Sequence, residues 1–490
     1  MELKYLLEEL PDARVDGNRE VDLERIHCDS RRVEQGDLFV AVRGGQEEDR
    51  HLYVADAVAR GARAVVVEDE VNCGGATRVQ VADCRTALAR LSARFYDFPS
   101  QHMLNIGITG TNGKTTTAFL LRSVLEAAGL SCGYVGTLGC RIDGELQQVG
   151  NTTPEAAELH RLLRLMVDRG KRAVVLEVSS HGLALKRVEG IPFHAAVFSN
   201  LTRDHLDFHG TWEQYFAAKA QLFENMPEDG VAVVNLDDPM AAKLIRRTRA
   251  RVLTYGYDQA AQVRLRQVEP APSGAILSFD TPLGPLTTEA HLAGGLNHYN
   301  TMAALATGLA LELDPRAVCG GVASLKNVPG RFERIAEGQN FEVIVDYAHT
   351  PDALQRVLQA AREMGAQRLI CVFGCGGDRD RGKRALMGEV AGELAELTVL
   401  TSDNPRSEDP TRIIADITAG VAKAREFHSE VDREQAIGFA LAEARKGDIV
   451  VIAGKGHEST QELSNSVISF DDRDVARRAL RLLLAGEGRP

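Results

Sequence analysis

The chain has 490 residues, of which 44% are hydrophobic and 26% charged, and its formal net charge is −12. Because this length exceeds what one hydrophobic core serves, two to four domains are expected. The acidic balance argues against nucleic-acid binding, which requires a basic surface. No apolar run reaches the roughly 18–20 residues of a membrane span, and residues 1–12 lack the basic and apolar regions of a secretory signal.

The eight cysteines are scattered through the chain without CxxC spacing. Several lie in apolar or glycine-rich stretches, as reduced thiols do in cytoplasmic proteins, so the cytoplasm is the expected compartment. Cys371 and Cys375 lie close together, but no second ligand pair accompanies them. The spacing therefore disfavours a zinc site.

Strand-like apolar runs alternate with helical patterns along the first hundred residues. Strands are expected at 37–42, 64–68 and 79–82, followed by an amphipathic helix at 86–96. The residues at 97–100, Asp-Phe-Pro-Ser, then break the pattern. A first domain is therefore predicted over residues 1–100.

A second unit begins with a strand at 103–109, a glycine-rich turn and a helix at 115–128. Buried strands are predicted at 173–178, 195–199 and 231–235. Alternating residues with Pro and Gly turns at 262–290 indicate an antiparallel flap, and a helix is expected at 297–313. This second domain is predicted to span residues 101–329.

The remainder repeats strand and helix in turn, which predicts a third, Rossmann-like domain over residues 330–490. Its strands are expected at 341–345, 368–373, 397–401 and 448–453, and its last helix at 473–484. The whole pattern is typical of an α/β fold with mainly parallel sheets. Functional residues are expected in loops that follow the carboxyl ends of the strands.

A phosphate-binding motif lies between the strand and the helix that open the second domain. It reads Gly107-Ile-Thr-Gly-Thr-Asn-Gly-Lys-Thr-Thr116, with Ile108 where the common GxxxxGK[ST] pattern has glycine. Small residues let backbone N–H groups turn toward phosphate at a helix N-terminus. Lys114 supplies a cation, and the Thr115 hydroxyl suits Mg²⁺. The motif therefore predicts ATP binding by Gly110, Thr111, Asn112, Gly113, Lys114, Thr115 and Thr116.

This loop, and further motifs in the same order along the chain, resemble those of the Mur ligases, which build the peptide stem of peptidoglycan. The motifs begin with Asp29-Ser-Arg31, Asn151-Thr-Thr153, Glu177-Val-Ser-Ser-His181 and Asn200-Leu-Thr-Arg-Asp-His205. They continue with Asn297–Asn300, Gly330-Arg-Phe-Glu333, Asp346-Tyr-Ala-His-Thr-Pro351, Gly374–Arg379, Asp403-Asn-Pro-Arg406 and Gly454-Lys-Gly-His-Glu458. The resemblance is greatest to members that add meso-2,6-diaminopimelate to UDP-MurNAc-L-Ala-D-Glu.

The resemblance implies three domains that hold the UDP end of the precursor, ATP and the incoming amino acid, in chain order. It implies that ATP phosphorylates the γ-carboxylate of D-glutamate and that the diaminopimelate amine attacks the acyl phosphate. Such a step requires cations between carboxylate and triphosphate. The chain is expected to act as a monomer on small-molecule substrates, without nucleic acid.

Four residues are predicted to serve catalysis: Lys114, Glu177, His205 and Lys219. Glu177 ends a buried strand, where a carboxylate is either hydrogen-bonded or a metal ligand. Lys219 would ordinarily be a solvated helix lysine. The resemblance implies instead that CO₂ carbamylates Lys219 and that Mg²⁺ is held by Thr115, Glu177, His205 and the carbamate.

The remaining positions follow from the resemblance, although each taken alone is also compatible with a cap, a turn or a salt bridge. Asn297, Arg331 and Asp346 would contact the nucleotide. The UDP precursor would be held by Ser30, Gln46, Asn151, Thr152, Thr153, Ser179 and Arg187. Leu185 departs from relatives that carry glutamine there, so one substrate hydrogen bond is placed in doubt.

Selection of the amino acid is predicted to depend on the segment 403–406. Diaminopimelate carries a carboxylate beside its distal amine, so its recognition requires an arginine for the carboxylate and an acid for the ammonium. The predicted set is Arg379, Asp403, Asn404, Pro405, Arg406, Gly454 and Glu458. In a ligase that adds lysine, the charge of such an arginine would have no substrate carboxylate to pair with. Segment 403–406 is also compatible with a simple helix-entry loop.

Three alternatives remain open at this point. The nearest is the same ligase with L-lysine as its substrate. A folylpolyglutamate-type ligase is disfavoured by Asp29-Ser-Arg31 and by the 403–406 motif. A nucleotide switch without ligase activity would retain the phosphate loop, but it would not explain the polar loops of the other two domains.

Overall fold

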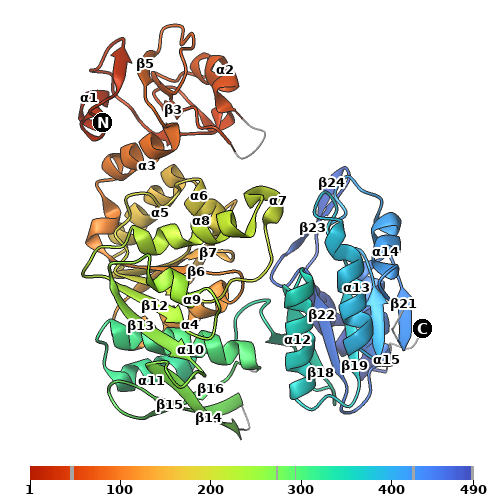
Figure 1. The fold of residues 1–490 in the computed structure, drawn as a ribbon. Coiled ribbons are helices and arrows are strands. Elements are labelled where there is room, and N and C mark those ends of the chain that lie inside the picture. Colours follow the sequence, from red (N-terminus) through yellow and green to blue (C-terminus); the bar gives the residue numbers. More distant parts are fainter. Residues whose placement is uncertain (45–48, 272–273, 293, 422–424, 487–490) are drawn as a thin grey trace. The chain divides into compact units, whose positions relative to one another are not determined.

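The computed structural model describes residues 1–44, 49–271, 274–292, 294–421 and 425–486 (Figure 1). The chain forms two compact units. The first comprises Met1–Leu201, His205–Arg264 and Ala303–Gly321, and the second Thr202–Asp204, Leu265–Met302 and Val322–Pro490. Within the described ranges, no helix combines the length and the apolar character that crossing a membrane requires.

The first unit begins with a five-stranded sheet in the order β1-β5-β4-β3-β2. Only β1 is antiparallel to its neighbour. The strands are β1 (Arg14–Asp16), β2 (Ile26–His27), β3 (Leu38–Val40), β4 (Ala64–Val67) and β5 (Thr77–Gln80). Apolar side chains of α1 (Leu3–Leu6) and α3 (Cys84–Phe95) cover one face, and those of α2 (Val54–Ala59) cover the other. Short 3₁₀ helices lie at Leu7–Glu9, Ser30–Arg32, Arg50–Tyr53 and Pro99–His102.

The largest sheet has the order β16-β15-β14-β13-β12-β11-β6-β10-β7-β8-β9. Its strands from β7 across to β13 are parallel, and β8, β9 and the β15–β16 pair are antiparallel. The first of these strands are β6 (Leu104–Thr109), β7 (Cys132–Gly136), β8 (Gly139–Ile142), β9 (Glu145–Gln147), β10 (Ala173–Glu177) and β11 (Ala195–Phe198). The others are β12 (Val231–Asn235), β13 (Arg251–Gly256), β14 (Val263–Ala271), β15 (Gly274–Asp280) and β16 (Leu286–Ala290).

Helices cover the parallel part of this sheet. α5 (Ala156–Asp168) buries leucine and methionine side chains at helical spacing, because its apolar residues recur every three to four positions. The other helices are α4 (Lys114–Ala127), α6 (Ser180–Ala184), α7 (Leu206–His209), α8 (Trp212–Glu224), α9 (Ala241–Ile245), α10 (Gly295–Ala310) and α11 (Pro315–Ser324). Because β6 lies between β10 and β11, the segments after Thr109, Glu177 and Phe198 meet at one edge of the sheet.

The second unit contains a six-stranded sheet in the order β17-β18-β22-β19-β20-β21 (Figure 1). All strands but β17 are parallel. They are β17 (Glu333–Arg334), β18 (Glu342–Asp346), β19 (Leu369–Phe373), β20 (Leu397–Leu400), β21 (Glu426–Ser429) and β22 (Ile449–Ala453). The pair β23 (Thr460–Leu463) and β24 (Ser466–Ser469) forms a separate hairpin.

Two hydrophobic clusters cover the opposite faces of this sheet. One contains α12 (Pro351–Glu363), α13 (Gly382–Leu394) and α14 (Pro410–Thr418). The other contains α15 (Arg433–Glu443) and α16 (Asp472–Leu484). Helices on both faces of a parallel sheet confirm the doubly wound pattern predicted for this part of the chain.

The expected α/β class is confirmed, and the predicted strands agree with the observed ones to within about two residues at each end. The flap predicted at 262–290 is present as the antiparallel pair β15–β16. Sequence reasoning missed the interior strands β7, β8 and β13, the edge strands β1, β2, β9, β17 and β21, and the hairpin β23–β24. The edge strands and the hairpin are short or largely exposed, so they lack the continuous apolar run of a central strand. β7 is fully buried, but two glycines interrupt its apolar run.

Candidate active site

A tight turn joins β6 to α4 and carries the phosphate-loop motif. Gly110 has a φ of +148° and Gly113 a φ of +88°. A Cβ atom on Gly110 would lie 1.9 Å from Ser199 Oγ. Glycine is required there, because a side chain would collide with the end of β11. The turn leads into α4, whose N-terminus offers N–H groups to an anion.

Residues that follow β11 hold this loop from the side. Asn200 Oδ1 accepts from the Asn112 N–H at 3.0 Å, and its Nδ2 donates to the Asn112 carbonyl at 3.1 Å. The Ser199 hydroxyl donates to that carbonyl at 2.7 Å, and the Thr111 N–H donates to the Asn200 carbonyl at 2.9 Å. Sequence reasoning gave Ser199 and Asn200 no site role. The adjacency of β6 and β11, which the sequence does not show, brings them to the loop.

Two lysine ammonium groups approach the loop. Lys114 Nζ donates to the carbonyl oxygens of Gly110 at 2.8 Å and Thr111 at 2.9 Å. Lys219 Nζ donates to the same Gly110 oxygen at 2.8 Å and lies 4.7 Å from the centre of the Tyr215 ring. Lys219 is only 1% exposed, so the expectation from its helix alone, a solvated lysine, is wrong. Packing of α8 on the sheet buries it.

Glu177, at the end of β10, is surrounded by hydrogen-bond donors. Its Oε1 accepts from the Tyr134 hydroxyl at 2.5 Å and the Thr137 N–H at 3.2 Å. Its Oε2 accepts from the hydroxyls of Thr115 and Thr137, each at 3.0 Å. These contacts stabilise a carboxylate that is 1% exposed. Thr115 and Glu177, predicted to act together, are therefore in direct contact, whereas Tyr134 and Thr137 were missed.

The predicted precursor-binding residues gather next to Glu177. The Thr152 and Thr137 hydroxyls lie 3.1 Å apart. The Thr153 hydroxyl contacts the Glu177 carbonyl at 2.9 Å and Ser179 Oγ at 3.1 Å. Ser179 also caps α6 by accepting from the Gly182 N–H at 3.0 Å. Thr152, Thr153 and Ser179 thus form one connected group, and Asn151 beside them is exposed.

Arg187 completes this group from the buried side. Its guanidinium donates to the Thr153 carbonyl at 2.9 Å and to Glu155 at 2.8 Å. Glu155, which sequence reasoning missed, also pairs with Arg85 of α3 at 3.5 Å. Arg85 in turn donates to the carbonyl of Leu185 at 3.2 Å. Through these contacts, α3 is tied to the segments that are predicted to bind the precursor.

An imidazole cluster lies on the segments that follow β10 and β11. The His181 ring is 4.8 Å from that of His205 and 5.5 Å from that of His209. His205 has a φ of +52°, a strained backbone conformation that is frequent at functional sites. Burial, with the nearby charges of His181 and Lys219, lowers the pKa of His209 to about 4.

The remaining residues predicted to bind the nucleotide and the precursor are distributed over both units. Ser30 is buried in the first, and Gln46 lies outside the described residues. In the second unit, Asp346 accepts from the N–H groups of Phe332 at 2.7 Å and Ala348 at 2.8 Å, and burial raises its pKa. Arg331 lies over the Tyr347 ring at 4.6 Å, and Asn297 accepts from Asn300 at 3.0 Å.

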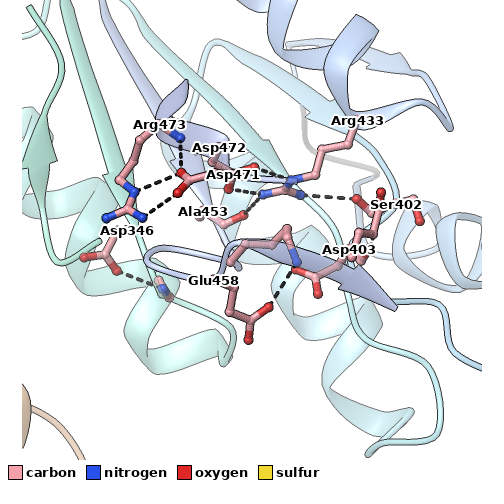
Figure 2. A network of polar contacts seen from close by, with 12 residues as sticks. Asp346, Ser402, Asp403, Arg433, Ala453, Glu458, Asp471, Asp472 and Arg473 are labelled. Carbon is pink, nitrogen blue, oxygen red and sulfur yellow. Dashed lines mark hydrogen bonds and ion pairs between the residues drawn. The ribbon is translucent and has the colours of Figure 1, made fainter. Parts of the chain in front are cut away.

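The predicted amino-acid site lies at the carboxyl ends of β20 and β22 (Figure 2). Asn404 Nδ2 donates to Glu458 Oε2 at 2.9 Å. Lys455 Nζ, which is fully buried, donates to Glu458 Oε2 and to Asn404 Oδ1, each at 3.0 Å. Sequence reasoning included Asn404 and Glu458 but not Lys455. The structure brings all three together.

Arg406 and Arg379 approach the same glycine. A Cβ atom on Gly376 would lie 3.0 Å from Arg406 NH1 and 3.8 Å from Arg379 Cγ. Arg406 has a φ of +50°, and its Nε pairs with Glu462 Oε2 at 2.6 Å. Its NH1 donates to the Gly377 carbonyl at 2.9 Å. Arg406 is thus held by groups that sequence reasoning missed, whereas Arg379 is exposed.

Asp403 and Gly454 are packed closely together. A Cβ atom on Gly454 would lie 2.5 Å from Asp403 Oδ2, so this position requires glycine. Asp403 Oδ1 accepts from the Asn404 N–H at 2.7 Å. Pro405 is close-packed as well, because its carbonyl would lie 1.9 Å from a Cβ atom on Gly377. The segment 403–406 is thereby fixed against the turn after β19 and the turn after β22.

A fully buried ion pair, also missed from the sequence, lies behind this segment. Figure 2 shows the Arg433 guanidinium between Asp472, Ala453 and Ser402. Arg433 donates to both Asp472 oxygens at 2.7 Å and to the Ala453 carbonyl at 2.9 Å. It also donates to the Ser402 carbonyl at 3.3 Å. Despite burial, the charges of Asp472, Asp403 and Glu458 raise the Arg433 pKa. The pair links β22 with the segment after β20.

Comparison with known proteins identifies the family of this chain. Residues 108–308 match the Mur ligase middle domain, and residues 330–456 match the Mur ligase glutamate ligase domain. The UDP-N-acetylmuramoyl-L-alanyl-D-glutamate–2,6-diaminopimelate ligase of Solibacter usitatus is 48% identical over 92% of each chain. The chain belongs to the Mur ligase family. The equally named ligase of Syntrophomonas wolfei is 43% identical over 98% of this chain and 99% of its own.

Solved structures agree with this assignment. A structure of UDP-N-acetylmuramoyl-L-alanyl-D-glutamate–2,6-diaminopimelate ligase is similar at a TM-score of 0.69 and 36% identity, over 99% of this chain and 100% of that chain. The MurF ligase of Thermotoga maritima in complex with ADP has a TM-score of 0.63 at 21% identity, over 95% and 97% of the two chains, and shows likeness of fold. This Mur ligase is therefore a three-domain, ATP-dependent enzyme that forms amide bonds.

Proposed function

We propose that the enzyme adds meso-2,6-diaminopimelate to the D-glutamate γ-carboxylate of UDP-MurNAc-L-Ala-D-Glu, with release of ADP and phosphate. The observation that carries this proposal is the pairing of charges in the second unit. Arg406 is held in place by Glu462 and Gly377, and Glu458 lies in the same network through Asn404. A carboxylate and an ammonium on one carbon of the substrate match an arginine and a glutamate. The names of the relatives from Solibacter usitatus and Syntrophomonas wolfei agree with this substrate.

The chemistry requires that the γ-carboxylate be activated, because oxide is too poor a leaving group for an amine to displace. Transfer of the ATP γ-phosphate to the carboxylate gives an acyl phosphate. The neutral amine of diaminopimelate then attacks the acyl carbon, and phosphate leaves. Lys114 supplies positive charge at the phosphate loop, where carboxylate and triphosphate would otherwise repel each other.

We also propose a magnesium site formed by Thr115, Glu177, His205 and carbamylated Lys219. The donor set suits a hard cation, since Thr115 and Glu177 bring oxygen atoms within 3.0 Å of each other. The Thr115 and Thr137 hydroxyls can turn their protons away from Glu177 and so release lone pairs on Oε2. Bound Mg²⁺ would neutralise charge between the two anionic substrates.

Carbamylation of Lys219 fits its surroundings. The neutral amine takes up CO₂ and releases one proton, which leaves an anionic carbamate on Nζ. Lys219 is only 1% exposed, so a carbamate formed there would be shielded from bulk water. The carbamate would supply an oxygen ligand beside Tyr215, which an unmodified lysine cannot do.

The other predicted residues have corresponding roles in this proposal. Asn151, Thr152, Thr153, Ser179 and Arg187 hold the muramoyl-dipeptide, Ser30 and Gln46 hold the UDP end, and Asn297, Arg331 and Asp346 hold the nucleotide. Arg379, Asp403, Asn404, Pro405, Arg406, Gly454 and Glu458 hold diaminopimelate. The three domains are proposed to span residues 1–100, 101–329 and 330–490, in a cytoplasmic monomer.

Phosphate release with ATP and UDP-MurNAc-L-Ala-D-Glu tests the proposal when meso-diaminopimelate and L-lysine are compared as acceptors. Turnover is expected with diaminopimelate and at a much lower rate with lysine. Faster turnover with lysine would show that lysine, and not diaminopimelate, is the substrate. ATP hydrolysis that ignores the muramoyl-dipeptide would reject ligation of this precursor altogether.

A further inference from the structure

Lys455 is a buried cation beside the proposed amino-acid site. It lies two residues after the end of β22, and its side chain has no exposed surface. Its ammonium donates to Glu458 Oε2 at 3.0 Å, Asn404 Oδ1 at 3.0 Å and the Thr460 carbonyl at 2.6 Å. Lysine is rarely buried in this way unless its charge is paired and all three donors are satisfied. Here the geometry meets both conditions.

The contacts of Lys455 fix the orientation of Glu458. Lys455 and Asn404 both donate to Oε2 of this carboxylate, so the same oxygen is held from two directions. Oε1 takes part in neither contact, and Tyr347 is a further hydrogen-bond partner of the Glu458 side chain. The side chain of Glu458 is 29% exposed, which leaves it accessible to a substrate ammonium. A carboxylate that several partners hold in one orientation loses little conformational entropy when it binds a ligand.

A second line of contacts leads from Lys455 to Arg406. Asn404 Oδ1 accepts from Lys455 and also from the Glu462 N–H, at 3.0 Å each. Glu462 lies on β23, and its carboxylate pairs with Arg406 Nε at 2.6 Å. The Arg406 N–H in turn donates to the Glu462 carbonyl at 3.1 Å. Lys455 therefore supports the arginine that would bind a carboxylate as well as the glutamate that would bind an ammonium.

We propose that Lys455 is a positioning residue for the distal amino-acid group of the acceptor. This inference rests on the proposed function and assigns a residue that does not itself need to touch the substrate. Lys455 orients Glu458 directly and Arg406 through Asn404 and Glu462. Loss of its ammonium should therefore weaken recognition of the acceptor amino acid while leaving the ATP and precursor subsites intact.

The test compares Michaelis constants for all three substrates in the full-length enzyme. Lys455→Met removes the charge and nearly preserves the volume. Lys446→Met makes the same replacement at an exposed position of the same unit and serves as the control. Lys455→Met is expected to raise KM for meso-diaminopimelate at least tenfold, with KM for ATP and UDP-MurNAc-L-Ala-D-Glu within about twofold of wild type. Lys446→Met should match wild type throughout.

A double-mutant cycle with Glu458→Gln identifies the route of the effect. If Lys455 acts largely through Glu458, Lys455→Met should cost much less in the Glu458→Gln background than in the wild type. Full additivity of the two changes would overturn the direct contact as the cause. Should Lys455→Met fail to fold, Lys455→Gln, which retains an N–H donor, takes its place in the same assay.

The outcomes separate this inference from the proposed function. Wild-type enzyme that does not use meso-diaminopimelate refutes the proposed function before any variant is measured. Wild-type turnover with diaminopimelate and an unchanged KM in Lys455→Met refutes only the positioning role. Equal rises in KM for all three substrates, with a lowered melting temperature, would likewise refute it, because they report a general loss of structure.

Discussion

Lys114 and Lys219 donate to the same acceptor, the carbonyl oxygen of Gly110, each at 2.8 Å. They come from different helices, α4 and α8, and lie 105 positions apart in the numbering of the sequence. In the unmodified chain, two ammonium groups thus converge on the turn where an anionic triphosphate is proposed to bind. Only Lys114 belongs to the phosphate-loop motif. The fold, and not a local pattern, brings Lys219 to the same atom.

Lys219→Ala is expected to lower kcat by roughly 10² or more, because it removes the carbamate that is proposed to hold Mg²⁺. Added bicarbonate should not restore the activity. Lys243→Ala, at an exposed position of the same unit, is the control and should retain wild-type turnover. Carbon-13 NMR with labelled bicarbonate should show a carbamate signal in the wild type and none in Lys219→Ala. Wild-type turnover by Lys219→Ala would refute the carbamate.

Gly110→Ala is expected to abolish ATP-dependent turnover. The added Cβ would lie 1.9 Å from Ser199 Oγ, and the φ of +148° is unfavourable for any residue with a side chain. Gly320→Ala is the matched control, since Gly320 lies in α11 with open space around it. Alanine there should be neutral or should stabilise by about 0.5–1 kcal/mol. Equal activity of the two variants would contradict the close packing of the loop.

The strands and the phosphate loop could be predicted because each depends on residues adjacent in sequence. Burial of Lys219 could not, since it arises from packing of α8 on the sheet. The partners that hold predicted site residues were missed for the same reason. Asn200 contacts Asn112 across 88 positions, Lys455 contacts Asn404 across 51, and Glu462 contacts Asn404 across 58. No local pattern marks these residues, because the contacts join positions far apart in the sequence and lysines and glutamates are usually solvated.

Stability is expected to fall in mild acid because of His160. This residue is fully buried in α5, neither ring nitrogen has a partner among the described residues, and burial lowers its pKa to about 4. The unfolded chain binds the proton below about pH 6.5, whereas the folded chain does not until about pH 4. His160 therefore costs no stability above about pH 6.5, where it is neutral in both states. The free energy of unfolding falls as the pH falls from about 6.5 toward 4, because only the unfolded chain takes up the proton.

Urea unfolding should show a loss of about 2 kcal/mol from this group between about pH 7.5 and pH 5. His160→Leu removes the titrating group and places an apolar side chain at the same buried position of α5. Its free energy of unfolding should depend less on pH by that amount. An unchanged pH dependence in His160→Leu would show that other groups dominate the acid response.

Arg406→Lys is expected to raise KM for meso-diaminopimelate by about 10- to 100-fold, because a lysine cannot form the two-pronged contact of a guanidinium with a carboxylate. The replacement retains the charge and meets the same backbone strain at φ +50°. KM for ATP should not change. Steady-state kinetics with each substrate varied in turn measures this, and an unchanged KM for diaminopimelate would remove Arg406 from the proposed carboxylate site.

Removal of one member of the Arg433–Asp472 pair should destabilise the second unit strongly. Both side chains have no exposed surface, so Arg433→Met leaves an uncompensated carboxylate in the interior, at a cost of about 3–5 kcal/mol. Arg433→Met combined with Asp472→Leu removes both charges and should recover much of that loss. The N-cap of α16 is Asp471, which both variants retain. Urea unfolding of the three proteins tests this, and a double variant no more stable than Arg433→Met would show that the hydrogen bonds to Ser402 and Ala453, not charge pairing, hold this region.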